Sequence, residues 1–426
     1  MSFATEPDKP ELLSLIPAAR LRGVWRRYGA LGQGSAVALM TALALLWLGY
    51  QAWRLLFQTT LMGAVDLHLR YDEVHAWFAA RPVYSLSNTA VYPPATFPLL
   101  WPWVGWLDWS WARGLWALTM LGALVWLGLI FVRAAGAQTR IARAFVLLML
   151  LATYPVGASI GNGQLIVLQL PLLITAVLLV HRDGGWKADI SAALLLLIAL
   201  MKPTTAAPFF WAAFFPQLRW RAPLLAIAVY AVLTLFAASF QAGTALDLIG
   251  QSLTNSAALL KISDPAFYGD VHVWLNAIGL TAWAVPVSVL LLLAHGGWTF
   301  LNRRADIWAL IGVAGIIARL WTYHQWYDDA LILPALLALY RIARATWPAN
   351  SSVAAGVLLG LNVLFMLAPG GLFVLPYPLN VLYTSLETML WLALLAFLMF
   401  VAPRLPTTAD SSLRGGAVAP RAVHAL

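Results

Sequence analysis

The sequence predicts an all-α protein that crosses a membrane many times, and three observations carry this prediction. Hydrophobic residues make up 62% of the 426 residues, and the mean hydropathy is +0.80. Only 10% of the residues are charged, too few to cover the surface of a soluble domain. Apolar runs of about 20 residues, long enough to cross a hydrocarbon core of roughly 30 Å, recur along the chain. We therefore expect a polytopic membrane protein with both ends in the cytoplasm.

The apolar runs predict about twelve transmembrane helices. They begin near Ser35, Ser110, Ala144, Gln164, Ala188, Thr204, Ala222, Ala277, Asp306, Asp329, Ser351 and Val381. We predict a cytoplasmic tail over residues 1–34, a transmembrane domain over 35–403 and a second cytoplasmic tail over 404–426. No signal-peptide pattern with a cleavage site precedes the first run, so this run is predicted to remain as a membrane anchor.

Basic residues predict the orientation, because Lys and Arg in short loops stay on the cytoplasmic side. With the N-terminus inside, 19 of the 26 Lys and Arg residues fall in cytoplasmic segments. The other seven lie on or near the outer face: Arg54, Arg70, Arg81, Arg113, Lys202, Lys261 and Arg319. The net charge of +9 is therefore mostly a topology signal, with some attraction to the anionic lipid bilayer, and it does not indicate a nucleic-acid partner.

Composition and motifs exclude several kinds of site. The chain has no cysteine, which removes disulfides, thiolate metal sites and cysteine nucleophiles. Its seven histidines are scattered, and neither a DxD nor an HExxH spacing occurs. Adjacent carboxylates such as Asp328-Asp329 diverge on a helix and are poor cation ligands. We predict no metal and no cofactor, and the lack of a Walker motif argues against ATP-driven transport.

The first outer loop, residues 58–109, begins with a predicted amphipathic helix over 65–78 that lies along the membrane surface. Its apolar stripe is formed by Leu67, Tyr71, Val74 and Phe78. The opposite side carries Asp66, Arg70 and Glu73, and the spacing of Asp66 and Arg70 predicts that the cation keeps this carboxylate ionised. An interfacial helix with surface ion pairs would explain the pattern equally well. However, an ionisable group so soon after a span is costly unless it is used.

Prolines interrupt the rest of this loop. Arg81-Pro82-Val83-Tyr84 and Tyr92-Pro93-Pro94 lack the N–H groups that a continuous helix needs. We predict a short outer-face or re-entrant element over residues 94–107. If it were a span, Arg133 and its basic neighbours would lie outside, against the charge rule.

Four later outer segments carry polar groups that a lipid-facing surface would not hold. They contain Asn162 and Gln164, Lys202, Gln251, and the dense segment 319–329 with Arg319, Tyr323, His324 and Asp328. Structural explanations exist for each: a snorkelling Lys202, interhelical hydrogen bonds from Asn162 and Gln164, and an aromatic belt around His324. The clustering of these groups at one face favours a site instead.

A sugar carried on a polyprenyl phosphate would need such a face. Its lipid tail needs a membrane groove, and its phosphate needs fixed cations, for which Arg70, Lys202, Arg319 and His324 are the candidates. An acceptor hydroxyl that attacks the anomeric carbon must lose a proton, while the phosphate leaves as a stable anion. One carboxylate base is then sufficient, and Asp66 is the candidate.

Several short motifs occur in the order seen in glycosyltransferase family 87, formerly a domain of unknown function (DUF2029). They are Asp66, Arg81-Pro82-Val83-Tyr84, Tyr92-Pro93-Pro94, Gly161-Asn162-Gly163-Gln164, Met201-Lys202-Pro203, and the segment from Tyr323 to Leu336. The chain resembles this family of GT-C-fold enzymes over roughly residues 35–404. The family includes polyprenyl-phosphate-mannose-dependent α-mannosyltransferases of bacterial envelopes.

The resemblance implies a GT-C fold, Asp66 as catalytic base and His324 as a donor-phosphate contact. It also implies a glycolipid or glycan acceptor and mannose as the first donor sugar to test, although the family also uses arabinofuranose. The short tails carry no eukaryotic retention signal, so we expect a bacterial inner membrane with the active site on the periplasmic side. We include Arg70, Tyr92, Asn162, Gln164, Lys202, Gln251, Arg319, Tyr323, His324 and Asp328 as candidate substrate contacts. The chain departs from the family at Ala79-Ala80-Arg81, where a glycine-containing segment is common.

Two other functions fit the same layout. A secondary transporter or lipid flippase also commonly has twelve spans with both termini inside. No internal repeat supports it, and Glu387 is the only ionisable group well inside a predicted span, as either a proton relay or a buried structural acid. An inactive scaffold or polymerase subunit is the third possibility, and the presence of Asp66 argues against it.

Overall fold

The computed structural model describes residues 18–60, 62–86, 89–182, 184–261, 269–345 and 349–404. Within these ranges the regular elements are helices, with one isolated bridge between Thr153 and Leu367. The prediction of an all-α chain is therefore confirmed for the described residues. Of the predicted C-terminal tail only Arg404 is described. The predicted N-terminal tail over 1–34 is described from Ala18 on, where the structure has the first part of α1 instead of a tail.

Five helical segments are long and apolar enough to cross a membrane. They lie in α1 (Ala18–Phe57), α5 (Trp109–Ala135), α11 (Arg221–Ala238), η1–α14 (Thr281–Trp283 and Ala284–Leu301), and α19–η3 (Leu379–Val401 and Ala402–Arg404). At most 39% of each apolar window is buried, so these helices present much of their apolar surface to the outside, as lipid-facing helices do. A sixth span is possible if α7 (Tyr154–Asn162) and α8 (Ile166–His181), which meet at 115°, act as one broken helix.

Shorter helices occupy the other predicted spans. They are α6 (Arg140–Leu151), α9 (Gly185–Ala199), α10 (Pro203–Phe214), α15 (Ile307–Leu320), α16 (Leu333–Arg344) and α17 (Ala349–Met366). At 1.5 Å per residue, a helix of 12 residues such as α10 extends only about 18 Å. The count of twelve spans therefore remains a prediction.

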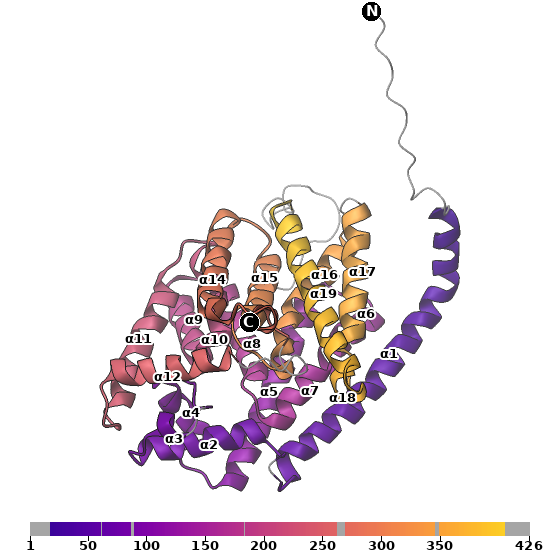
Figure 1. Cartoon of the computed structure of the whole chain (residues 1–426). Helices are drawn as coiled ribbons and strands as arrows, with labels where there is room; N and C mark the ends of the chain where they lie inside the picture. The colour runs from indigo at the N-terminus through magenta and orange to yellow at the C-terminus, as the bar shows by residue number, and fades with distance from the viewer. Residues whose placement is uncertain are drawn as a thin grey trace, which may run out of the picture.

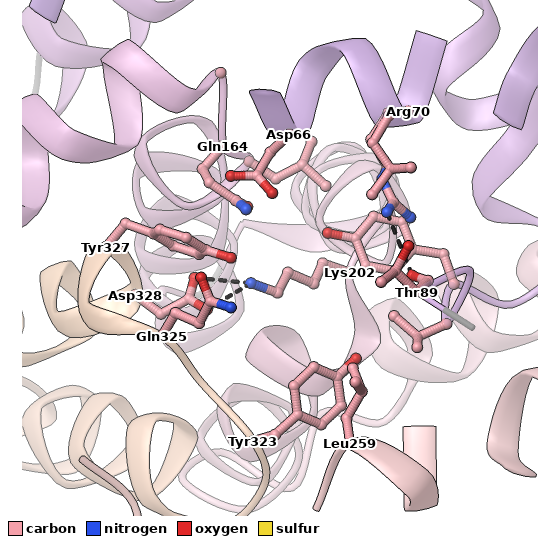
Figure 2. Close-up of a pocket in the computed structure, with 15 residues that line it drawn as sticks. Asp66, Arg70, Thr89, Gln164, Lys202, Leu259, Tyr323, Gln325, Tyr327 and Asp328 are labelled. Atoms are coloured by element: carbon pink, nitrogen blue, oxygen red, sulfur yellow. Dashed lines mark hydrogen bonds and ion pairs between the residues drawn. The ribbon is translucent and has the colours of Figure 1, made fainter. Parts of the chain in front are cut away.

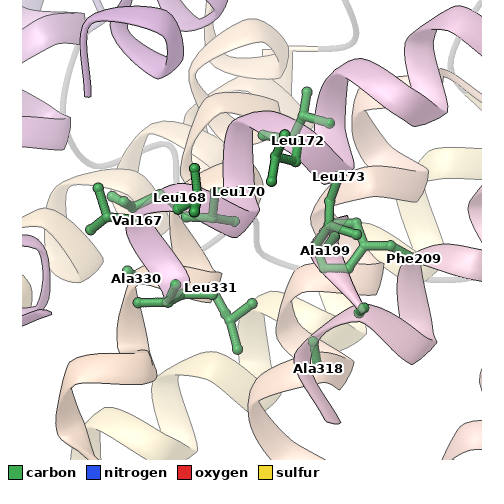
Figure 3. Packing of buried hydrophobic residues seen from close by; sticks show 14 of the residues in the cluster. Val167, Leu168, Leu170, Leu172, Leu173, Ala199, Phe209, Ala318, Ala330 and Leu331 are labelled. Carbon is green, nitrogen blue, oxygen red and sulfur yellow. The ribbon is translucent and has the colours of Figure 1, made fainter. Parts of the chain in front are cut away.

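Two shorter helices, α8 and α15, lie in the core of the molecule. Every residue of α15 is buried, and so is most of α8. Figure 3 shows leucines of α8 packed against Phe209 of α10, Ala318 of α15 and Leu331 of the 3₁₀ helix η2 (Trp326–Ile332). Because these helices are enclosed by protein, they need not match the full bilayer thickness as a lipid-facing helix must.

The first outer loop gathers at one end of the bundle. In Figure 1, α2 (Val65–Phe78), α3 (Val83–Leu86) and α4 (Thr96–Val104) lie at the lower edge, below α12 (Ala245–Leu259), and the N-terminal end of α1 lies at the opposite edge. The element predicted over 94–107 corresponds to α4, a helix of nine residues. The remaining short helices, outside this loop, are α13 (Val271–Ala277) and α18 (Gly371–Val374).

The predicted helix over 65–78 is present with the same bounds, but its polar side is not exposed. Arg70 and Glu73 are 8% and 4% exposed, because this side of α2 faces protein. The apolar side is fixed by Trp77, whose ring stacks on Phe97 of α4 at 4.1 Å between centroids and whose Nε1 donates to the carbonyl of Ala237. Both sides of the helix therefore contact protein, so the alternative explanation by surface ion pairs does not hold for Arg70 and Glu73, and the position of the helix along the membrane surface stays a prediction.

Candidate functional site

A polar cavity of about 150 Å³ lies where α2, the α7–α8 turn, the start of α10 and η2 meet (Figure 2). Seven of the predicted site residues line it: Asp66, Arg70, Tyr92, Gln164, Lys202, Tyr323 and Asp328. Eight residues that were not predicted complete the lining: Leu69, Thr89, Val91, Gly163, Leu165, Leu259, Gln325 and Tyr327. The fold therefore brings together segments that are far apart in sequence.

The α7–α8 turn positions the first turn of α2. The amide of Ala64 donates to the carbonyl of Gly161 over 3.0 Å. Gly163 adopts a φ of +71°, which favours glycine, and a Cβ at this position would lie 2.5 Å from the Cβ of Leu67. The turn and the helix are thus in close backbone contact, and this contact places Asp66 beside Gln164.

Two of the outer-face arginines support this arrangement from behind. Arg54 donates to the carbonyl of Met62 at 2.7 Å and to Oδ1 of Asn162 at 3.0 Å. Arg113 donates to carbonyls at the end of α1, including that of Leu55 at 2.5 Å. Carbonyls at a helix C-terminus lack partners within the helix and attract cations. Asn162 therefore contacts Arg54 and does not line the cavity.

Asp66 carries the most unusual group in the cavity. The residue as a whole is only partly buried, but its Oδ2 is enclosed and has no hydrogen-bond partner among the described residues. Burial raises the pKa of Asp66 to about 6, although a hydrogen bond from Gln164 and the charges of Arg70 and Lys202 oppose the shift. A carboxylate with a pKa near neutrality and a free oxygen is suited to accept a proton.

Arg70 does not form the predicted ion pair with Asp66. Its Nη1 lies 2.6 Å from Oε2 of Glu73, and its guanidinium lies over the ring of Tyr92 at 4.3 Å. Burial raises the pKa of Glu73 to about 7, and the charge of Arg70 limits the shift. A spacing of three residues on a helix is as favourable for a pair as four, so Glu73 competes with Asp66 for the same cation.

Lys202, Asp328 and His324 form a chain of polar contacts. The Nζ of Lys202 lies 2.7 Å from both carboxylate oxygens of Asp328, and Nδ1 of His324 lies 2.8 Å from Oδ2. Burial alone would raise the pKa of Asp328, but Lys202 and His324 outweigh it and hold this pKa well below its usual range. Burial lowers the pKa of His324. Figure 2 shows Lys202 reaching across the cavity to Asp328.

Three predicted site residues lie away from the cavity lining, in addition to Asn162. His324 is buried on the far side of Asp328. Arg319 is buried and contacts Asp329, and Gln251 is exposed on α12. Gln325 and Tyr327 belong to the dense segment 319–329, so the polar residues around them in the sequence could have identified them. The apolar lining residues have no comparable sequence signal.

The described part of the chain contains no group of three or more His, Asp and Glu side chains that could hold a metal ion. The metal independence expected from the sequence remains to be tested. Comparisons with protein-family models, with curated proteins and with solved structures find no match for this chain.

Proposed function

We propose that this protein is an integral-membrane inverting glycosyltransferase that moves a sugar from a polyprenyl-phosphate donor to a glycolipid or glycan acceptor. The observation that carries the proposal is the enclosed, unpartnered Oδ2 of Asp66 in a cavity that the Lys202 side chain also lines. Other enclosed polar atoms of the described residues also lack a partner, but this one is a carboxylate oxygen in the cavity lining, where a substrate hydroxyl would supply the partner.

The reaction would need one base and one place for an anion. The acceptor hydroxyl donates its proton to Asp66 as its oxygen bonds to the anomeric carbon. The bond from that carbon to the phosphate oxygen breaks, and the polyprenyl phosphate leaves with the electron pair. Attack from the side opposite the phosphate inverts the configuration, and Lys202 and Arg70 stabilise the charge of the leaving group.

The cavity limits what can enter. Its volume of about 150 Å³ is below the roughly 300–1,000 Å³ of pockets that enclose drug-sized ligands. Only the reacting sugar and its phosphate would lie inside, with the lipid tail against the apolar helices. Both lining cations already have carboxylate partners, so a donor phosphate must share Lys202 with Asp328.

The proposals for the fold family, the donor sugar and the membrane rest on the sequence motifs. We propose a GT-C fold, membership of glycosyltransferase family 87, mannose as the donor sugar, and a bacterial inner membrane with the cavity facing the periplasm. Helix α2, which lines the cavity, lies at the end of the bundle opposite the N-terminal end of α1 (Figure 1), and the basic residues predict that this end faces the exterior.

The experiment is transfer of mannose from a short-chain polyprenyl-phosphate-mannose to a mixture of glycolipid acceptors by the purified full-length protein. Asp66→Asn is expected to lower turnover by about 10²-fold or more, with donor binding and folding retained. The matched control is Asp72→Asn on the same helix, whose carboxylate is 63% exposed and should be dispensable. Wild-type turnover in Asp66→Asn would remove Asp66 as the base.

One observation favours a second candidate, a secondary transporter or flippase. The α7–α8 pair bends by 115° at the cavity, and transporters commonly bind substrates where a membrane helix is broken. Proteoliposomes that move a lipid-linked sugar across the bilayer without forming any glycosylated product would support this function and exclude the first.

A further inference from the structure

A second polar cluster lies behind η2, away from the cavity lining, and we call it the Tyr154 cluster. It consists of Tyr154 on α7, Arg319 on α15, Asp329 on η2 and Glu387 on α19. Each of these residues is at most 2% exposed. The cluster therefore joins four elements deep in the protein and is shielded from solvent.

The hydroxyl of Tyr154 is its centre. Asp329 Oδ2 forms a short hydrogen bond with it, and both oxygens of Glu387 lie 3.0 Å away. A phenol has one proton to donate, and its oxygen can only accept further bonds. Two ionised carboxylates around one phenol would leave at least one carboxylate oxygen facing a lone pair, which is repulsive. One of the two acids must therefore carry a proton.

The contacts indicate which acid it is. The Nε of Arg319 donates to Oδ1 of Asp329 in a close ion pair, so Asp329 is the ionised member. No described cation forms an ion pair with Glu387, and among the described residues its carboxyl group is hydrogen-bonded to Tyr154. An unpaired charge at this depth would be costly, whereas a neutral acid that donates to the phenol oxygen is satisfied.

We propose that Glu387 is a permanently protonated acid, a proton-binding site inside the membrane domain, and that it positions Asp328 in the cavity through Tyr154 and Asp329. The positioning part rests on the proposed function of the cavity. The site is distinct from the base at Asp66, and its proton takes no part in the transfer reaction.

The link to the cavity is short. Asp328 and Asp329 are neighbours in a 3₁₀ helix, where successive side chains point about 120° apart, so one faces Lys202 while the other faces Tyr154. Helix α7 contacts the residues on both sides of Asp328. Ser159 donates to the carbonyl of Tyr327 over 2.9 Å, and Tyr154 binds the side chain of Asp329. A loss of the Tyr154 contact would release one of these two supports.

The positive charge of Arg319 reaches Glu387, but the Asp329 carboxylate that pairs with this cation has the larger and opposite effect. Arg319 lies with its guanidinium over Trp391 at 5.1 Å. Tyr383 on α19 donates to the carbonyl of Phe365, and Thr388 donates to backbone carbonyls. Asp270 and Asp328 also act on Arg319, so this cation has three carboxylates around it.

Infrared difference spectroscopy of the purified full-length protein tests the proton directly and does not depend on any enzymatic activity. A protonated carboxyl has a carbonyl-stretch band that a carboxylate lacks. We expect this band in the wild type from about pH 5 to about pH 9, far above the ordinary Glu pKa of about 4.3, and its loss in Glu387→Gln. Asp66 and Glu73 should add components that disappear near pH 6 and pH 7, so the diagnostic component is the one that Glu387→Gln removes. A wild type without that component, or one in which it disappears as the pH rises through this range, would overturn the proposal.

Activity of the same variants tests the positioning role. Glu387→Gln keeps a neutral donor, so turnover within about twofold of the wild type is expected, whereas Glu387→Leu and Tyr154→Phe each remove the hydrogen bond and should lower turnover about tenfold. Tyr154→Phe serves where Glu387→Leu does not fold. If Glu387→Gln is as impaired as Glu387→Leu, a charge is needed and the proposal fails. The infrared result stands even if no transfer activity is found.

Discussion

The cavity and the Tyr154 cluster lie on two sides of η2 and contain the same kinds of side chain in opposite states. In the cluster, every carboxylate oxygen of Asp329 and Glu387 has a partner within the protein. In the cavity, Oδ2 of Asp66 has no such partner among the described residues. Lys202 extends across the cavity toward Asp328, and both side chains line it. The carboxylates of the cluster are thus satisfied within the protein, where the unpartnered buried atom is Nη1 of Arg319, whereas in the cavity the carboxylate itself lacks a partner.

This difference in hydrogen-bond partners distinguishes a cluster that stabilises the fold from a cavity that can bind a substrate. A fully satisfied buried network fixes a geometry, because breaking any contact leaves a costly orphan. An incomplete one needs a substrate to complete it. Asp328 and Asp329 are adjacent in sequence, yet only Asp328 lines the cavity. The type of residue therefore does not indicate its role; the partners do.

Asp329→Asn should have the largest effect of the variants that separate the cluster from the cavity. We expect it to lower the free energy of unfolding by about 3–5 kcal/mol. The buried guanidinium of Arg319 would lose its only ion-pair partner among the described residues. Reversible unfolding in detergent micelles measures the loss, and the exposed Asp72→Asn should change it by at most about 0.5 kcal/mol. A loss below about 1 kcal/mol would mean that Glu387 ionises in place of Asp329.

Lys202→Gln should affect the cavity and not the cluster. We expect the donor KM to rise about tenfold or more, because a charge-assisted contact to the phosphate is lost. The double variant Lys202→Gln/Asp328→Asn leaves no orphan charge and should show the same rise, while the exposed Arg81→Gln should not. A double variant with wild-type KM would show that Lys202 does not contact the donor.

The pH profile sharpens the comparison because Asp66 titrates and Glu387, by the inference above, does not. With a pKa near 6, the Asp66 carboxylate is ionised above that pH and protonated below it. We expect kcat/KM to fall about tenfold for each pH unit below about 6, and Glu387→Gln to leave this limb in place. A limb centred near pH 7 that disappears in Glu73→Gln would identify Glu73 as the titrating group instead.

Gly163→Ala should have the smallest effect, and Gly136→Ala is its matched control. Both glycines have positive φ, so each alanine should cost about 1 kcal/mol of stability from the backbone conformation, and the contact with Leu67 adds to this cost at Gly163. Only at Gly163 would the new Cβ meet Leu67, next to Asp66, whereas nothing lies within 4 Å at Gly136. Turnover should therefore fall several-fold in Gly163→Ala alone. Equal turnover in the two variants would show that the turn does not position Asp66.

Local patterns in the sequence predicted the local structure well. The bounds of α2 follow from apolar residues at helical spacing, and a helix lies at each predicted span because long apolar runs have few alternatives in lipid. The pairing of Arg70 was wrong because spacing allows both Asp66 and Glu73. Gln251 was placed with the site because it lies in an outer-face segment, but its side chain is exposed.

The sequence alone was enough to predict the class of protein, the helices and the end of the bundle where polar groups gather. These features depend on hydropathy and periodicity, which can be read from residues close together in the chain. The tertiary structure decided which polar groups meet: Lys202 and Asp328 are 126 residues apart, and Tyr154 and Glu387 are 233 apart. Nothing near Tyr154 in the sequence pointed to Glu387. Periodicity gives a residue its side of a helix, but the helices packed against that side decide whether a carboxylate finds a partner or faces an open cavity.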